Sequence, residues 1–277
     1  MNKLISIIKI TRPANVLITF FVVIVAVLIA QKQNTGIEIM ILAALSAAFA
    51  TAAGNIINDI FDIETDKISH PDRVLVKGTL TIDEAWYEYL LFNLLSMLIA
   101  AILPSPLLFI VIFSLLLLYL YSAYLKKIIL IGNLTIAFLT GMTFIYGGFA
   151  VGNPVDAIIP AVFAFLINLI REIVKDIMDL EGDKKQNIIS LPAKCGIYFT
   201  KKLAAILSII LMAFTFYPFL ASIYKIEYFI IVMIFVNPVM VICIKNLLQK
   251  GETNFALISN LLKLNMILGL IAIYLGN

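Results

Sequence analysis

Residues 37–67, IEIMILAALSAAFATAAGNIINDIFDIETDK, lead from an apolar stretch directly into a group of acidic side chains. Up to Asn58 the only charged residue is Glu38, and the apolar part reaches the roughly 20 residues that a membrane-spanning helix needs. The end of the stretch, DIFDIETDK at Asp59–Lys67, has a second copy, DIMDLEGDK at Asp176–Lys184. That copy also follows a long apolar stretch. An acidic cluster at the edge of a membrane, used twice, is the main feature of this chain.

The composition is that of a membrane protein. Of the 277 residues 62% are hydrophobic and 13% charged, and the mean hydropathy is +1.07. Soluble domains have about 45–50% apolar and about 25% charged residues. A net charge of +3 gives no reason to expect a nucleic-acid partner, and nothing in the pattern specifies an oligomer. Two distant cysteines, Cys195 and Cys243, do not suggest a disulfide framework or a thiolate metal site.

The apolar pattern predicts an all-α membrane protein with nine transmembrane helices. The expected spans lie near residues 13–30, 37–58, 84–103, 106–124, 128–150, 155–175, 202–222, 226–247 and 254–275. Pro104-Ser105-Pro106 separates the third span from the fourth, because proline ends helices. We expect one domain over residues 1–277, with loops at 59–82 and 176–200 as partly helical caps that carry the acidic motifs. A capping box, Thr81 with Glu84, is expected to open the third span.

Basic residues indicate the orientation in a cell membrane. The connections after the odd-numbered spans carry only Lys32 and Lys225, while the opposite face carries most of the other lysines and arginines. The positive-inside rule then places the N-terminus in the cytoplasm and the C-terminus outside. Both acidic motifs, and any active site that they form, would face the cytoplasm.

The spacing of the acidic residues favours a cation site. At 100° per residue, Asp59, Asp62 and Asp66 fall within about 60° of one another on a helix, and Asp176, Asp179 and Asp183 repeat the arrangement. Three carboxylates on one stripe repel each other unless a cation lies among them. Oxygen ligands select hard cations such as Mg²⁺, which is often shared with substrate phosphates. Asn55 and Asn58 add amide oxygens near the first stripe.

Basic side chains accompany both stripes. They are Arg73 and Lys77 after the first and Arg171, Lys175, Lys184 and Lys185 around the second. Carboxylates, a divalent metal and basic groups together suit a diphosphate. Tyr121 and Lys126-Lys127, at and just beyond the end of the fourth span, either bind phosphate or anchor the interface. Arg12-Pro13 at the start of the first span leaves the same two alternatives.

At this point the chain resembles a known family. Asn58-Asp59-x-x-Asp62-x-x-x-Asp66 followed by Arg73 is similar to the first motif of the UbiA-type intramembrane prenyltransferases. Lys175-Asp176-x-x-Asp179-x-x-Gly182-Asp183 is similar to their second motif, and the nine-span layout covers the whole chain. The resemblance implies a helical bundle with a central cavity and Mg²⁺-dependent transfer of an isoprenyl group from its diphosphate.

The resemblance also implies roles for individual residues. The implied metal ligands or neighbouring catalytic carboxylates are Asn58, Asp59, Asp62, Asp66, Asp176, Asp179 and Asp183. The implied diphosphate-binding residues are Arg73, Lys126, Lys175 and Tyr121, with Arg12 and Lys184 as further candidates. Whether Lys126 or Lys127 matches the family position stays open.

The short interval from Asp66 to Arg73 resembles that of the archaeal ether-lipid enzymes and of the chlorophyll-synthase-like members of the family, and the segment Arg171–Lys184 looks especially like the archaeal ether-lipid enzymes. Where these commonly have Arg-Pro, this chain has Arg73-Val74. The implied reaction moves a geranylgeranyl group from geranylgeranyl diphosphate to the glycerol hydroxyl of geranylgeranylglyceryl phosphate. Two alternatives remain: prenyl transfer to an aromatic acceptor for a quinone or tetrapyrrole, and an ion-coupled transporter.

Overall fold

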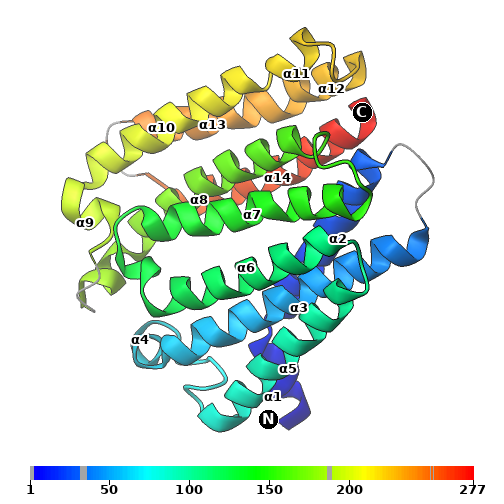
Figure 1. Cartoon of the computed structure of the whole chain (residues 1–277). Helices are drawn as coiled ribbons and strands as arrows, with labels where there is room; N and C mark the ends of the chain where they lie inside the picture. Colours follow the sequence, from blue (N-terminus) through cyan, green and yellow to red (C-terminus); the bar gives the residue numbers. More distant parts are fainter. Residues whose placement is uncertain (1–2, 32–35, 186–188, 250, 252) are drawn as a thin grey trace. The chain divides into compact units, whose positions relative to one another are not determined.

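The computed structural model describes residues 3–31, 36–185, 189–249, 251 and 253–277, and of residues 68, 69 and 183–185 the backbone alone. Regular structure in this part of the chain is entirely helical (Figure 1). The elements of the first half are α1 (Lys3–Ile10), α2 (Pro13–Ala30), α3 (Ile37–Phe61), α4 (Ile63–Ser69), α5 (Ile82–Ala101), α6 (Ser105–Ala123), η1 (Leu125–Lys127) and α7 (Ile131–Ala150). Those of the second half are α8 (Ile158–Lys185), α9 (Leu191–Cys195), α10 (Ile197–Phe214), α11 (Tyr217–Leu220), α12 (Ile226–Ile231), η2 (Val232–Val236), α13 (Asn237–Leu248) and α14 (Phe255–Gly276).

Each expected span coincides with a helix or with a short series of helices. The seventh corresponds to α10 with α11, and the eighth to α12, η2 and α13, where η2 is a single π-helical stretch. Seven of these segments in the described chain are long and apolar enough to cross a membrane. The other two, α5 and α8, carry charged residues at the end that bears an acidic or capping motif. The expected all-helical membrane architecture is therefore confirmed.

The helices group into two compact units, the first formed by Met1–Lys126 with Met142–Ala157. Its central helix is α3, which packs against α2, α5 and α6 (Figure 1). Small side chains on α3 allow close approach of neighbouring backbones, as is typical inside membranes. Ser46 of α3 and Ser96 of α5 each donate their hydroxyl to the other's carbonyl, at 2.9 and 2.8 Å. A side chain at Gly54 would meet Leu118 of α6 at 2.9 Å.

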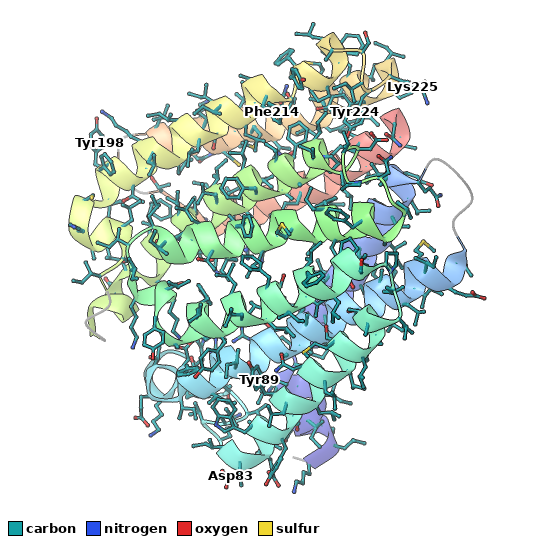
Figure 2. All side chains as sticks on the ribbon, viewed as in Figure 1. Asp83, Tyr89, Tyr198, Phe214, Tyr224 and Lys225 are labelled. Atoms are coloured by element: carbon teal, nitrogen blue, oxygen red, sulfur yellow. The ribbon has the colours of Figure 1, made fainter. Side chains whose placement is uncertain are left out.

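The second unit contains Lys127–Gly141 and Ile158–Asn277. Its apolar core is built on α8, where Ile170, Ile173 and Val174 form one buried cluster with residues of α10, α13 and α14. Tyr228 of α12 donates its hydroxyl to the carbonyl of Thr215 at 2.9 Å, near the link labelled by Tyr224 and Lys225 in Figure 2. In the same view Tyr198 marks the start of α10 and Phe214 its end, which lies toward this link. The second acidic motif therefore belongs to a long helix whose apolar part is firmly packed.

Candidate diphosphate and metal site

The first acidic motif lies where α3 ends. The helix stops at Phe61, Asp62 has φ −98° and ψ 5°, and α4 begins at Ile63. The sequence spacing assumed one unbroken helix, so this interruption is a correction. It is only one residue wide, because the amide of Asp62 donates to Asn58 and that of Asp66 donates to Asp62, at 3.0 and 2.7 Å. The three aspartates therefore still form one acidic group.

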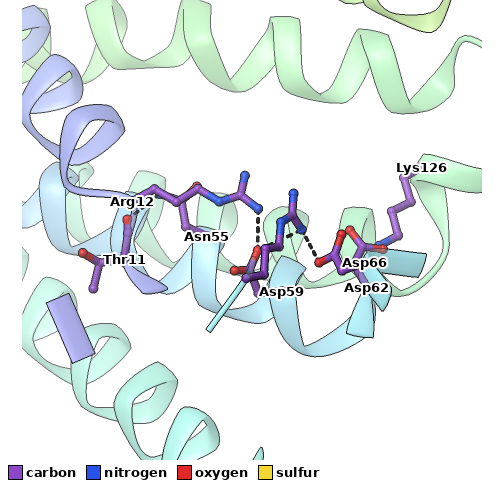
Figure 3. A network of polar contacts seen from close by, with 8 residues as sticks. Thr11, Arg12, Asn55, Asp59, Asp62, Asp66 and Lys126 are labelled. Carbon is purple, nitrogen blue, oxygen red and sulfur yellow. Dashed lines mark hydrogen bonds and ion pairs between the residues drawn. The ribbon is translucent and has the colours of Figure 1, made fainter. Parts of the chain in front are cut away.

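Three basic side chains from separate segments contact these aspartates (Figure 3). Arg12, from the turn before α2, and Arg73, from the loop after α4, both contact Oδ1 of Asp59, the second at 3.3 Å. Arg73 also bonds Asp66. Lys126, at the end of the first unit, bonds Oδ1 of Asp62. Three carboxylates thus face three fixed positive charges.

Burial makes the negative charges of this group energetically costly. The side chains of Asp59 and Asp66 are 6% and 4% exposed. Burial raises the pKa of Asp66 above its ordinary value; neighbouring Arg73 lowers it, and the charges of Asp62 and Asp59 raise it further. A buried carboxylate beside like charges is stabilised by additional positive charge. The positive charge of Arg73 alone therefore does not offset the burial of Asp66 and the negative charges of Asp59 and Asp62.

The donor chemistry of this segment fits Mg²⁺. Three carboxylates and the half-buried amide of Asn58 offer only oxygen ligands, which Mg²⁺ prefers. Within the described residues, no three acidic, histidine or cysteine side chains converge in the arrangement of a preformed metal site. The carboxylates are turned instead toward Arg12, Arg73 and Lys126. Asn58, Asp59, Asp62 and Asp66 are the residues of the first motif that would hold the metal.

The loop that carries Arg73 is packed in place. Val74 and Leu80 are 2% exposed and join Ile10, Ile56 and Ala85 in one apolar cluster. Thr79 donates both its amide and its hydroxyl to the carbonyl of Val74, each at 3.2 Å. Where related enzymes commonly have proline after this arginine, the chain has Val74. Its buried side chain anchors the loop next to Arg73.

The start of α5 completes this loop. The expected capping box is present, since the amide of Glu84 donates to Thr81 Oγ1 at 3.2 Å and the amide of Thr81 donates to Glu84 Oε2 at 2.9 Å. The loop is thus held at both ends, by α4 and by a capped helix.

The choice between Lys126 and Lys127 follows from their positions. Lys126 is 14% exposed and bonds Asp62, whereas Lys127 is exposed. Tyr121 lies half-buried on the last turns of α6, shortly before them. The contact with Asp62 identifies Lys126 as the basic residue associated with the first motif.

The second motif lies on the last turns of α8, which runs without a break to Lys185. Asn133 of α7 donates its amide to Oδ2 of Asp176 at 3.0 Å. Lys175 bonds Glu172 at 3.1 and 3.2 Å, and Arg171 bonds the same carboxylate at 3.0 Å. Asp179 is exposed. The side chains of Asp183 and Lys184 lie outside the described part of the structure.

Two contacts of the second motif were not anticipated. Glu172, 13% exposed, is the partner of both Arg171 and Lys175, although the sequence interpretation considered only the two basic residues. Asn133 was overlooked because a single asparagine near the start of a span is not a distinctive signal. The sequence offered a clue to Glu172, an acidic residue between two basic ones near the expected end of the sixth span.

Comparisons with known proteins show what the chain as a whole is similar to. A family model described as "UbiA prenyltransferase family" matches residues 18–265. The chain is 39% identical to a protein of Methanosphaera stadtmanae named digeranylgeranylglyceryl phosphate synthase, over 82% of both chains.

Solved structures show the same similarity. A structure described as digeranylgeranylglyceryl phosphate synthase in membranes superposes with a TM-score of 0.82 and 33% identity, covering 100% of this chain and 99% of that one. A UbiA homologue from Archaeoglobus fulgidus, bound to GPP and Mg²⁺, has a TM-score of 0.75 and 23% identity, covering 97% of this chain and 99% of that one.

Proposed function

Because the chain belongs to the UbiA prenyltransferase family, we propose that it transfers a geranylgeranyl group from geranylgeranyl diphosphate to the glycerol hydroxyl of geranylgeranylglyceryl phosphate. The product would be the doubly geranylgeranylated glyceryl phosphate of archaeal ether lipids. The names of relatives at 39% and 33% identity support this acceptor. The observation that carries the proposal is the group of three aspartates, two of them buried, with Arg12, Arg73 and Lys126.

This group suits a diphosphate because its basic side chains are already fixed in place. In the transfer, the bond from the allylic carbon to the diphosphate oxygen breaks, and a bond to the glycerol oxygen forms. The glycerol proton and diphosphate are released. Negative charge grows on the leaving diphosphate, and positioned positive charges stabilise it most effectively where water is scarce. Arg12, Arg73 and Lys126 are the donors for this task, with Tyr121 shortly before Lys126 in the sequence.

The carboxylates have a complementary task. Mg²⁺, when bound, neutralises diphosphate oxygens and makes the diphosphate a better leaving group. Asn58, Asp59, Asp62 and Asp66 would bind the metal from the first motif, and Asp176, Asp179 and Asp183 from the second. The Mg²⁺ in the Archaeoglobus fulgidus homologue belongs to that protein and is consistent with a metal requirement here. On the second motif, Lys175 and Lys184 would hold diphosphate.

The surroundings of the reaction are also part of the proposal. The protein is a multi-pass membrane protein, and we place its N-terminus and both acidic motifs on the cytoplasmic side and its C-terminus outside. The loops at 59–82 and 176–200 would act as caps of a single catalytic domain. An apolar chamber would hold the isoprenyl chain and keep water from the reacting carbon.

An acceptor panel tests the proposal directly. Purified protein in lipid nanodiscs is incubated with labelled geranylgeranyl diphosphate, Mg²⁺ and one acceptor at a time. We expect labelled ether product with geranylgeranylglyceryl phosphate and none with 4-hydroxybenzoate or a chlorophyll precursor. Product with an aromatic acceptor alone would overturn the choice of acceptor, and no product with any acceptor would overturn the proposed reaction.

A further inference from the structure

Arg12 has an unusual backbone conformation. Its φ and ψ are 53° and 72°, in the left-handed region that side chains other than glycine rarely adopt. Pro13 follows it, and a residue before proline strongly prefers an extended backbone. Such conformations persist where the surrounding structure enforces them, and they gather at functional sites. Something in this structure must therefore hold the turn between α1 and α2.

A long-range contact that helps to hold the turn comes from α3. Asn55 donates its side-chain amide to the carbonyl of Thr11 at 2.8 Å, across 44 positions of sequence (Figure 3). That carbonyl belongs to the peptide unit immediately before Arg12. Since φ of Arg12 is the rotation between this peptide unit and the rest of the residue, a bond to the carbonyl restrains φ from one side, while Asn15 and Val16 hold the carbonyl of Arg12 itself on the other. The amide of Arg12 belongs to the same peptide unit and donates to the carbonyl of Lys9 at 3.1 Å, and the hydroxyl of Thr11 donates to the carbonyl of Ile8 at 2.8 Å; these two bonds are local to the end of α1, whereas that of Asn55 comes from another helix.

The same helix receives the side chain of Arg12. Its guanidinium bonds Asp59, which lies four residues after Asn55 and so on the same side of α3 (Figure 3). One face of α3 thus makes two contacts with the turn: Asn55 bonds its backbone, and Asp59 bonds the side chain of Arg12. The sequence interpretation treated Asn55 as a source of amide oxygen, but here its nitrogen makes the contact.

We propose that Asn55 is a positioning residue for prenyl transfer: it holds the turn at Arg12 so that the guanidinium stays at the first acidic motif, ready for the diphosphate. This inference rests on the proposed function. It differs from a general role in packing, because Asn55 should matter only while Arg12 has its side chain.

The chain offers a matched control for packing. Thr51, one helical turn before Asn55, donates its hydroxyl to Thr19 of α2 at 3.1 Å. This contact also joins α3 to the N-terminal part of the chain, but it touches neither Arg12 nor the acidic motif. Thr51→Ala therefore measures what a lost contact from this helix costs on its own.

A double-mutant cycle with Asn55→Ala and Arg12→Ala tests the inference. We expect Asn55→Ala to lower kcat/KM for geranylgeranyl diphosphate about 10-fold, mainly through KM, since small displacements of a positioned group are costly. In the Arg12→Ala background it should cost less than about 2-fold. Asn55→Gln, which keeps the amide donor, should recover part of the loss, and Thr51→Ala should shift Tm with little effect on kcat/KM.

Equal losses in both backgrounds, or a loss with Thr51→Ala as large as with Asn55→Ala, would overturn the positioning role. The same cycle is repeated on the binding of inorganic diphosphate with Mg²⁺, without acceptor. If wild-type protein transfers no prenyl group, the proposed function fails, and the binding cycle still decides the coupling: a coupled loss supports the role of Asn55 and additive losses contradict it.

Discussion

At the scale of single residues, the first motif is a largely buried group of acidic side chains paired with basic ones. Removing one partner from such a group leaves a buried charge without compensation, which costs about 3–5 kcal/mol. Arg73 contacts two aspartates, while Arg12 and Lys126 contact one each. In the proposed reaction these basic groups would bind the diphosphate as Mg²⁺ binds the carboxylates.

Lys126 and Lys127 allow a direct comparison, because they are adjacent and differ in environment. We expect Lys126→Met to lower kcat/KM by roughly 10- to 100-fold, the equivalent of one charge-assisted hydrogen bond. Lys127→Met serves as the control and should stay within about 2-fold of wild type, since exposed charges contribute little. Steady-state kinetics with geranylgeranyl diphosphate decides the matter. A larger loss with Lys127→Met would transfer the role to the exposed lysine.

At the scale of elements, the loop between α4 and α5, residues 70–81, is packed against neighbouring helices. Val74, Leu75 and Leu80 are buried against Ile10 of α1 and Ile56 of α3. This packing holds Arg73 at Asp59 and Asp66 and contributes more to its position than the loop's surface ion pair of Lys77 with exposed Asp72. Apolar packing of the loop should therefore control how well the site binds diphosphate.

Leu80→Ala tests this dependence. Loss of a buried leucine side chain costs about 2–5 kcal/mol, and here the cost should appear as loosening of the loop. We expect faster hydrogen exchange over residues 70–80 and a higher KM for geranylgeranyl diphosphate. Leu90→Ala on α5 is the matched control, because Leu90 is 58% exposed. Unchanged hydrogen exchange in Leu80→Ala would contradict the claim that apolar packing holds this loop in place.

The elements also show how far the sequence can predict this structure. Hydropathy and Pro104-Ser105-Pro106 located the helices well, because length and helix breakers are local signals. The capping box at Thr81 was likewise local. The interruption of the helix at Asp62 was not predicted, nor were the contacts of Asn55 with Thr11 and of Asn133 with Asp176, because they depend on which segments meet in space.

At the scale of the whole molecule, a chain with seven described segments able to cross a membrane carries its acidic motifs at helix ends. The family and the kind of architecture were predicted from two motifs and hydropathy, and the comparisons confirm both. The individual site residues and the orientation in the membrane stay predictions. Native cysteines make the orientation accessible to experiment.

Cys195 is exposed and Cys243 is buried, so a thiol reagent should report on Cys195 alone. With a membrane-impermeant maleimide, we expect no labelling in intact cells and labelling of Cys195 after permeabilisation, because residues 176–200 are assigned to the cytoplasm. Ile223→Cys in a Cys195→Ser background should label in intact cells. The reverse pattern would invert the proposed topology.

The most direct test of the central claim is prenyl turnover as a function of Mg²⁺ concentration in three motif variants. Asp62→Asn and Asp179→Asn each remove one proposed metal ligand, whereas Glu64→Gln changes a side chain of the same segment that is 84% exposed and paired with Lys67. We predict losses of about 1,000-fold for the two aspartate variants, measured on protein that is still folded, and turnover close to wild type for Glu64→Gln. Near-wild-type turnover of Asp62→Asn or Asp179→Asn at saturating Mg²⁺ would contradict the account.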